Sequence, residues 1–301
     1  MAILFQQLLA MALLVGLGYV LGKKDMLHEK TGQDLSSFLM KVILPCMIFL
    51  AFDRDFSGSE AVELGEIFIL NFLCMGLNIL VAGLLFSEHE GIERYACVFN
   101  NKAFMGIPVV TALFGAEAVF YVTPSIVVNH LFIWTYGAAI LGRDRQALTL
   151  HRIFWNPSTI SFLLGLLYYV SPFRLPEPVG NALHLLRGVN TPLAMVLLGY
   201  FLCAESLPSI FQNRKAWKVS FVRLLLLPLL TVLGLWLLPG SSDFKYVMTI
   251  VWATPTAINL SMQAAMIGQD TGYAAQVTSL TTLLSLFTIP LVLQAAQWLI
   301  G

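Results

Sequence analysis

The stretch Tyr95–Gly115, YACVFNNKAFMGIPVVTALFG, has the length of a membrane-spanning helix, yet its centre is polar. That centre holds two amides, an ammonium, a glycine and a proline, namely Asn100, Asn101, Lys102, Gly106 and Pro108. Proline removes a backbone donor, and glycine weakens the helix around it. Backbone groups released at bilayer depth must be satisfied by protein, water or a ligand. We therefore predict an interrupted helix at a functional site.

The composition places the remainder of the chain in a membrane as well. The 301 residues are 58% hydrophobic and 11% charged, whereas a soluble domain has about 25% charged residues. The formal net charge of +0 provides no basic face for nucleic acid. The four cysteines lack CxxC spacing, so we expect neither a disulfide framework nor a metal site. There is no HExxH, P-loop or GxSxG motif. We expect no enzyme, no nucleotide-driven pump and no cofactor.

Ten apolar runs approach the roughly 20 residues that a membrane-crossing helix needs. They cover residues 3–21, 35–52, 62–86, 95–114, 118–141, 157–171, 181–204, 217–238, 245–267 and 275–300. The odd-numbered loops between them hold ten Lys and Arg residues, and the even-numbered loops hold three. Since positively charged loops stay in the cytoplasm, we predict a multi-pass protein of the plasma (inner) membrane with both termini outside.

The spacing of prolines indicates an internal repeat. Pro45 and Pro192 are 147 residues apart, and so are Pro108 and Pro255. A repeat with five spans enters the membrane from the opposite side in its second copy, as in many secondary transporters. The predicted fold is an all-α polytopic membrane protein with ten helices in a 5+5 inverted repeat. Its parts are a first repeat (1–141), a cytoplasmic connecting loop (142–156) and a second repeat (157–301).

The ninth span, residues 245–267, is the predicted partner of the fourth. It carries Pro255 among polar residues, including Thr256, Asn259 and Gln263. We predict that the two broken helices cross at Gly106, Pro108 and Pro255. The N-termini of their second halves, near Ile107–Pro108 and Pro255–Thr256, then point into the crossing, where their partial positive charge favours an anion.

Charge decides the kind of substrate. None of the seventeen acidic residues lies in the central part of a predicted span. Lys102 lies inside the interruption, where a bare charge costs roughly 2.5–3.5 kcal/mol on insertion scales. The sequence therefore predicts a negatively charged substrate. The predicted binding residues are Asn100, Asn101, Lys102, Thr256 and Asn259, with Asn129, His130 and Gln263 as secondary candidates.

Alternative roles stay open for several of these residues. The prolines also fit plain packing kinks, and Lys102 also fits an anchor whose stem extends toward water. Asn129 and His130 also fit a hydrogen-bonded helix contact. Arg223, near the cytoplasmic end of span eight, is expected to be an anchor. Trp252 is expected to be a packing group.

The segment Asn101-Lys102-Ala103-Phe104-Met105-Gly106-Ile107-Pro108 resembles the N-x-G-F-x-G-I/L-P signature of the auxin efflux carrier family. That family includes the plant PIN proteins and bacterial malonate-transporter-like members. The resemblance covers the whole chain and includes Pro255-x3-Asn259 in span nine. It differs at Lys102-Ala103, where the family has a small residue after the asparagine, and in the short loop Gly142–Asn156.

The resemblance implies a carrier in which spans four and nine cross at their prolines. It implies a scaffold of spans one, two, six and seven, and a transport part of spans three to five and eight to ten. It also implies a homodimer, with Asn101 and Asn259 near the substrate carboxylate.

These inferences lead to one functional hypothesis and two alternatives. The hypothesis is a secondary transporter that moves a small carboxylate across the lipid bilayer by alternating access. Outward movement of one negative charge through about 100 mV gains roughly 2.3 kcal/mol, so efflux needs no coupled ion. The first alternative is a sodium- or proton-coupled organic-anion symporter of the bile-acid type. The second is a membrane sensor that does not transport. The coupling ion is left open.

Overall fold

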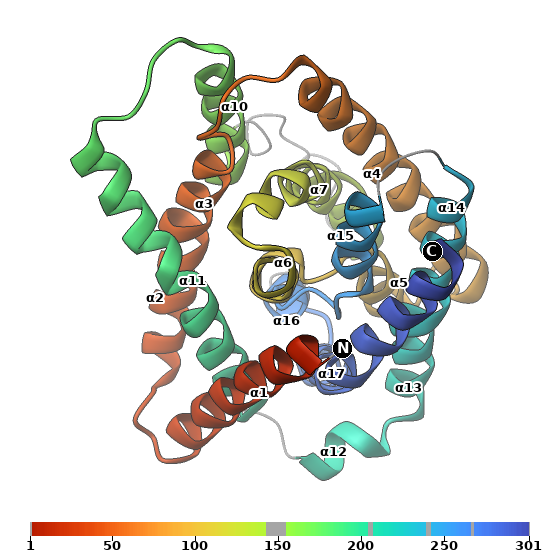
Figure 1. Ribbon diagram of the computed structural model, residues 1–301. Helices are drawn as coiled ribbons and strands as arrows, with labels where there is room; N and C mark the ends of the chain where they lie inside the picture. The colour runs from red at the N-terminus through yellow and green to blue at the C-terminus, as the bar shows by residue number, and fades with distance from the viewer. Residues whose placement is uncertain (1, 143–154, 204–206, 239–241, 266–267, 301) are drawn as a thin grey trace. The chain divides into compact units, whose positions relative to one another are not determined.

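The computed structural model describes residues 2–142, 155–203, 207–238, 242–265 and 268–300, and within these ranges the backbone is helical apart from short connections (Figure 1). The helices of the first half are α1 (Ala2–Lys23), α2 (Glu29–Phe38), α3 (Leu44–Leu50), α4 (Gly58–Leu85), α5 (Gly91–Val98), α6 (Ile107–Phe114), α7 (Val119–Phe132) and α8 (Ala138–Ile140). Those of the second half are α10 (Pro157–Val170), α11 (Glu177–Cys203), α12 (Leu207–Gln212), α13 (Arg214–Phe221), α14 (Leu227–Leu237), α15 (Ser242–Ala253), α16 (Leu260–Ala265) and α17 (Thr271–Ile300). The predicted connecting loop falls mostly on residues 143–154, which lie outside the described residues.

The helices confirm an all-helical protein with membrane-spanning character. Six helices are long and apolar enough to cross a membrane, namely Lys30–Leu50, Gly58–Leu85, Ala116–Ile140, Glu177–Cys203, Arg214–Leu237 and Thr271–Ile300. Shorter apolar helices are Leu9–Lys23, Lys102–Phe114 and Pro157–Val170. Helices also occupy part or all of every range predicted to span the membrane. The number of ten spans and the inverted repeat stay predictions.

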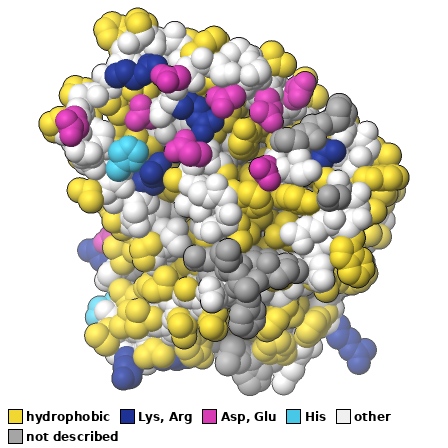
Figure 2. All heavy atoms as spheres, in the orientation of Figure 1, with side chains coloured by type: hydrophobic (Ala, Val, Ile, Leu, Met, Phe, Trp, Pro, Cys, Tyr) yellow, Lys and Arg dark blue, Asp and Glu magenta, His cyan; other side chains and the backbone are white. Residues whose placement is uncertain are grey.

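Large apolar side chains are exposed along these helices, as expected for surfaces that face lipid. Leu84, Phe287 and Trp298 are among the most exposed, at 76%, 77% and 83%. In Figure 2 hydrophobic side chains cover large parts of the visible surface, whereas most visible acidic side chains gather in the upper part of the view.

Three of the prolines are preceded by a wider helical turn. π-helical turns at Leu39–Ile43, Lys102–Gly106 and Val222–Leu226 each end two residues before a proline that lies in the first turn of α3, α6 or α14. A proline cannot donate to the carbonyl four residues earlier, and its ring collides with that carbonyl. Widening the preceding turn relieves this conflict, and such π-turns are frequent at functional sites.

The helices form two compact units, each with its own core. Unit 1 comprises Met1–Ile69, Ala103–Val127 and Leu150–Ala204, and unit 2 comprises Leu70–Lys102, Val128–Thr149 and Glu205–Gly301. The predicted scaffold spans fall in unit 1 and the predicted spans eight to ten fall in unit 2, while spans three to five contribute to both. The division into scaffold and transport parts stays a prediction.

In unit 1 the helix α1 packs along α11 through glycines (Figure 1). A Cβ added at Gly18 would collide with the backbone of Val196, and one added at Gly199 would collide with the backbone of Val15. The two backbones therefore approach as closely as small residues allow, which is a common way of packing helices in membranes.

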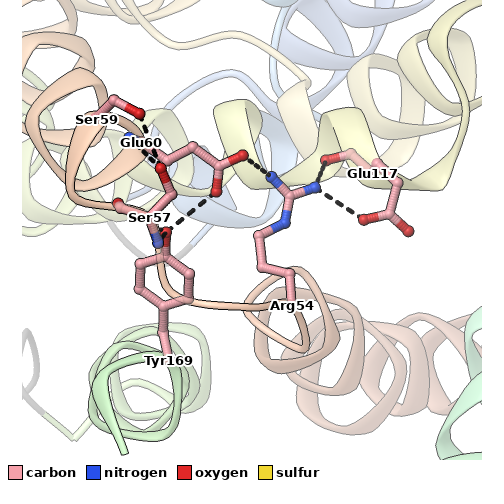
Figure 3. Close-up of polar contacts among 6 residues, drawn as sticks. All are labelled: Arg54, Ser57, Ser59, Glu60, Glu117 and Tyr169. Carbon is pink, nitrogen blue, oxygen red and sulfur yellow. Dashed lines mark hydrogen bonds and ion pairs between the residues drawn. The ribbon is translucent and has the colours of Figure 1, made fainter.

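A polar cluster in unit 1 brings together Arg54 after α3, Glu117 before α7 and Tyr169 near the end of α10 (Figure 3). The Arg54 guanidinium donates to Glu117 Oε2 at 2.8 Å and to Glu60 Oε1 at 3.2 Å, and it lies 4.7 Å from the centre of the Phe120 ring. The Tyr169 hydroxyl donates to Glu60 Oε2 at 3.1 Å and accepts from the Ser57 amide at 2.9 Å. Burial lowers the pKa of Arg54, but the hydrogen bond to Glu117 and the charges of both carboxylates raise that pKa by more.

Arg54→Ala is expected to destabilise the protein by about 1–3 kcal/mol, because Arg54 joins two carboxylates and is only 17% exposed. Arg174→Ala is the matched control, because its ion pair with Asp55 is exposed, at 46% and 99%, and such pairs contribute about 0–1 kcal/mol. Denaturation of the purified protein in detergent measures both changes. Equal loss of stability in the two variants would contradict a structural role specific to Arg54.

Candidate functional site

Two helices of unit 2 are interrupted, and their interruptions meet. α5 ends at Val98 and α15 ends at Ala253, and the chain is extended beyond both. Asn100 and Thr256 form an antiparallel bridge. The Asn101 amide donates to Pro255 O at 2.7 Å, and the Ala257 amide donates to Phe99 O at 3.0 Å. Backbone groups that leave the helices thus find partners in each other, as a membrane interior requires.

The local sequence explains both interruptions. Asparagine bonds readily to nearby backbone groups and so competes with helix formation. The Asn100 side-chain amide donates to Val251 O at 2.7 Å and to Thr254 Oγ1 at 2.9 Å, which ties the first interruption to the second. Pro255 lacks an amide hydrogen, and a residue before proline favours an extended backbone. Thr254 and Pro255 therefore end α15.

Arg223 holds the carbonyl ends of both interrupted helices. Its guanidinium donates to Cys97 O at 2.8 Å, to Thr254 O at 3.2 Å and to Trp252 O. The side chain is completely buried. The last carbonyls of a helix have no helical partner and carry partial negative charge, so a buried guanidinium stabilises both ends at once. The expectation that Arg223 is an anchor at a cytoplasmic helix end is wrong.

Lys102 is buried next to the same interruption. The side chain is 2% exposed, and its ammonium lies 3.6 Å from the centre of the Trp252 ring. An ammonium over an indole face forms a cation–π interaction, which recovers part of the lost hydration energy. His130 and Cys74 lie close enough to interact with the charge of Lys102. The site therefore has two buried basic groups, Lys102 and Arg223.

Asn100 and Asn101 meet the segment of Pro255 and Thr256 at the paired interruption, and the predicted binding residues differ in what their side chains do. The Thr256 hydroxyl donates to Ala96 O at 3.0 Å, so it supports the backbone. Asn101 is 4% exposed and Gln263, in α16, is also 4% exposed. Asn259 lies in the turn before α16 and is partly buried. Whether they contact a substrate stays a prediction.

Several acceptor atoms in this unit have no hydrogen-bond partner among the described residues. They include the buried side-chain oxygens of Asn100, Asn129 and Asn259 and the Nδ1 atom of His130. Such groups cost free energy when buried, so each of them indicates a place where water, an ion or a ligand binds. Among the residues that the structure describes, no group of three or more His, Cys, Asp or Glu is placed to hold a metal ion.

The three predicted crossover residues occupy different local structures. Gly106 ends the π-helical turn and Pro108 lies in the first turn of α6, both in unit 1. Pro255 lies in the extended segment of unit 2. α6 begins at Ile107 as expected, but the first interruption already starts at Phe99 and α16 begins only at Leu260. The crossing of Pro108 with Pro255 stays a prediction.

Sequence reasoning missed the contributions of Arg223 and Trp252. One signal was present, since Arg223 begins the segment Arg223–Pro228, RLLLLP, and an ionisable residue inside a span is a candidate functional residue. Trp252 gave no such signal, because tryptophan is common in apolar helices. Its role depends on the end of α15 lying beside Lys102.

A helical membrane protein with two interrupted helices that meet, and with basic groups and amides buried there, has the arrangement of a membrane transporter. The membrane transport protein family matches residues 3–152 and 143–293. The chain therefore belongs to this family, the auxin efflux carrier family.

Two relatives from archaea are similar over nearly their whole length. An uncharacterized transporter from Methanothermobacter thermautotrophicus is 26% identical over 305 residues, covering 95% of this chain and 96% of the relative. An uncharacterized transporter from Methanocaldococcus jannaschii is 25% identical over 298 residues, covering 90% of this chain and 96% of the relative. The family match shows that this chain is a membrane transport protein.

Proposed function

We propose that this protein is a secondary transporter for a small organic anion, a carboxylate, and that it works by alternating access. The observation that carries the proposal is the positive charge buried at the paired interruptions. Lys102 is 2% exposed and Arg223 is 0% exposed. A buried charge is costly and in membrane proteins marks a substrate or ion pathway. An anion with two hydrogen-bond-accepting oxygens is the substrate that this charge favours.

Arg223 also bears on the driving force. The carbonyls of Cys97, Trp252 and Thr254 are the kind of oxygen ligands that a coupling cation uses at broken helices. Arg223 already donates to all three, so a fixed guanidinium stands where a sodium ion would otherwise bind. This favours efflux of the anion driven by the membrane potential, which supplies about 2.3 kcal/mol per charge per 100 mV.

One observation favours a second candidate, a sodium-coupled organic-anion symporter. The side-chain oxygens of Asn100 and Asn259 have no hydrogen-bond partner among the described residues. Amide oxygens are suitable ligands for a hard cation. A sodium site that uses these oxygens, separate from the carbonyls held by Arg223, would serve uptake against the membrane potential.

Flux measurements in proteoliposomes test the two candidates. A thermal-shift screen of mono- and dicarboxylates on the purified protein first selects a probe. Uptake of the radiolabelled probe is then followed at imposed potassium diffusion potentials, with and without a sodium gradient. We expect flux that follows the potential in sodium-free buffer. Flux that requires sodium would support the symporter, and binding without flux at any potential would contradict transport.

A further inference from the structure

A cavity of about 560 Å³ lies in unit 2 and is lined in part by the start of α5, the first of the two interrupted helices. Three segments far apart in sequence meet around it: the start of α5, the connection into α13 and the start of α17. The lining shares no residue with the paired interruption. It includes Glu93, Lys215, Asp270, Tyr273 and Gln276. Cavities of 300–1,000 Å³ are of the size that binds small molecules.

The inner wall of this cavity carries a buried carboxylate. Glu93 is 5% exposed, and none of the ion pairs in the described part of the chain involves it. The Tyr273 hydroxyl lies close to this carboxylate and interacts with it. Buried carboxylates and hydroxyls are normally satisfied by partners. The Glu93 carboxylate, with the Tyr273 hydroxyl beside it, is therefore the acceptor that the inner wall offers to whatever enters.

The rim of the cavity carries an exposed ammonium, that of Lys215, and also the exposed carboxylate of Asp270. Lys215 and His89 line it, and Lys215 is exposed. Two other polar groups of the lining, Asn213 and Asp270, already make capping hydrogen bonds. Asn213 caps α13 by accepting from the Lys215 amide at 3.1 Å and also donates to Gln276 Oε1 at 3.0 Å. Asp270 caps α17 by accepting from the Tyr273 amide at 2.9 Å. Glu93 at the inner wall, with Tyr273 beside it, and Lys215 at the rim form a pair of opposite charges that can select a ligand.

We propose that this cavity binds a small zwitterion with the chemistry of a free amino acid. Its ammonium reaches Glu93 and Tyr273 at the inner wall, and its carboxylate meets Lys215 at the rim. A simple anion would meet the Glu93 carboxylate unfavourably, and a simple amine would leave Lys215 unused. The three loops at the cavity are odd-numbered in the predicted topology, so the ligand is a cytoplasmic one. This is a site separate from the proposed transport site and independent of it.

Calorimetric titration of the purified full-length protein tests this site with three matched probes. L-glutamine carries both charges, 4-aminobutanamide lacks the carboxylate and glutaramate lacks the ammonium. We expect glutamine to bind more tightly than 4-aminobutanamide. Glu93→Gln should weaken glutamine binding by about tenfold or more, since it removes one member of a buried charge pair. Glu88→Gln is the matched control, because Glu88 is exposed on the same loop and does not line the cavity.

Three further variants keep the test decisive if Glu93→Gln does not fold. Tyr273→Phe should weaken the binding of both probes that carry an ammonium, glutamine and 4-aminobutanamide. Lys215→Ala should weaken the binding of glutamine and leave the binding of 4-aminobutanamide unchanged. Lys102→Ala should leave glutamine binding intact. Wild-type protein that does not bind glutamine at millimolar concentration overturns the proposal, and so does binding that survives in both Glu93→Gln and Tyr273→Phe. Binding that is lost in Lys102→Ala overturns it too, because the cavity would then be an entrance to the transport site.

Discussion

Arg223→Ala is expected to cost about 3 kcal/mol or more of folding stability, because it leaves three buried carbonyls without a donor. Each unsatisfied buried acceptor costs about 1–3 kcal/mol, and Cys97 O, Trp252 O and Thr254 O all depend on Arg223. The total folding stability of a protein is about 5–15 kcal/mol. A large fraction of the Arg223→Ala molecules should therefore fail to fold. Thermal unfolding in detergent, followed by size-exclusion chromatography, measures the loss.

Arg223→Lys and Arg214→Ala separate the possible causes of that loss. Lysine keeps the charge but cannot reach three carbonyls in a fixed planar geometry, so an intermediate loss is expected. Arg214→Ala removes an arginine that is exposed at the start of the same span, and its effect should be small. An unchanged melting temperature in Arg223→Ala would refute the structural role. If Arg223→Ala folds and its transport becomes sodium-dependent, the guanidinium indeed stands in for a coupling cation.

The helical class and the interrupted helices were predictable from local sequence. Pro255 acts on the backbone next to it, and asparagine at positions 100 and 101 is a weak helix former, so both effects are visible without a structure. Apolar runs of the right length likewise predict where helices form. Both signals are short-range, and for this reason the interruptions at Phe99 and Thr254 were anticipated to within a few residues.

The partners of the interruptions were not predictable in the same way. Arg223 is over a hundred residues from Cys97, and one sequence contains no information about which carbonyls a guanidinium will reach. The matched offset of Pro108 and Pro255 suggested equivalent positions, yet one is helical and the other extended. The pairing of Asn100 with Thr256 depends on how α5 and α15 pack. Such long-range contacts are set by tertiary structure.

Lys102→Met is expected to have opposite effects on transport and on stability. Methionine keeps much of the side-chain volume but removes the charge. Losing one partner of a buried charge pair costs about 2–5 kcal/mol, so transport of a carboxylate should fall by about 30-fold or more. Stability should rise, because an ammonium that is 2% exposed loses its hydration, and the Trp252 ring recovers only part of that energy.

Lys218→Met is the matched control for this change. Lys218 is exposed in the same unit, donates to Leu85 O at 2.8 Å and lies 4.4 Å from the centre of the Phe86 ring. It thus has an aromatic contact like that of Lys102 but lies outside the interruption. Transport should survive in Lys218→Met and stability should not increase. A Lys102→Met protein that transports normally would show that Lys102 is only an anchor, and a stabilised but inactive one would show that its burial serves the anion.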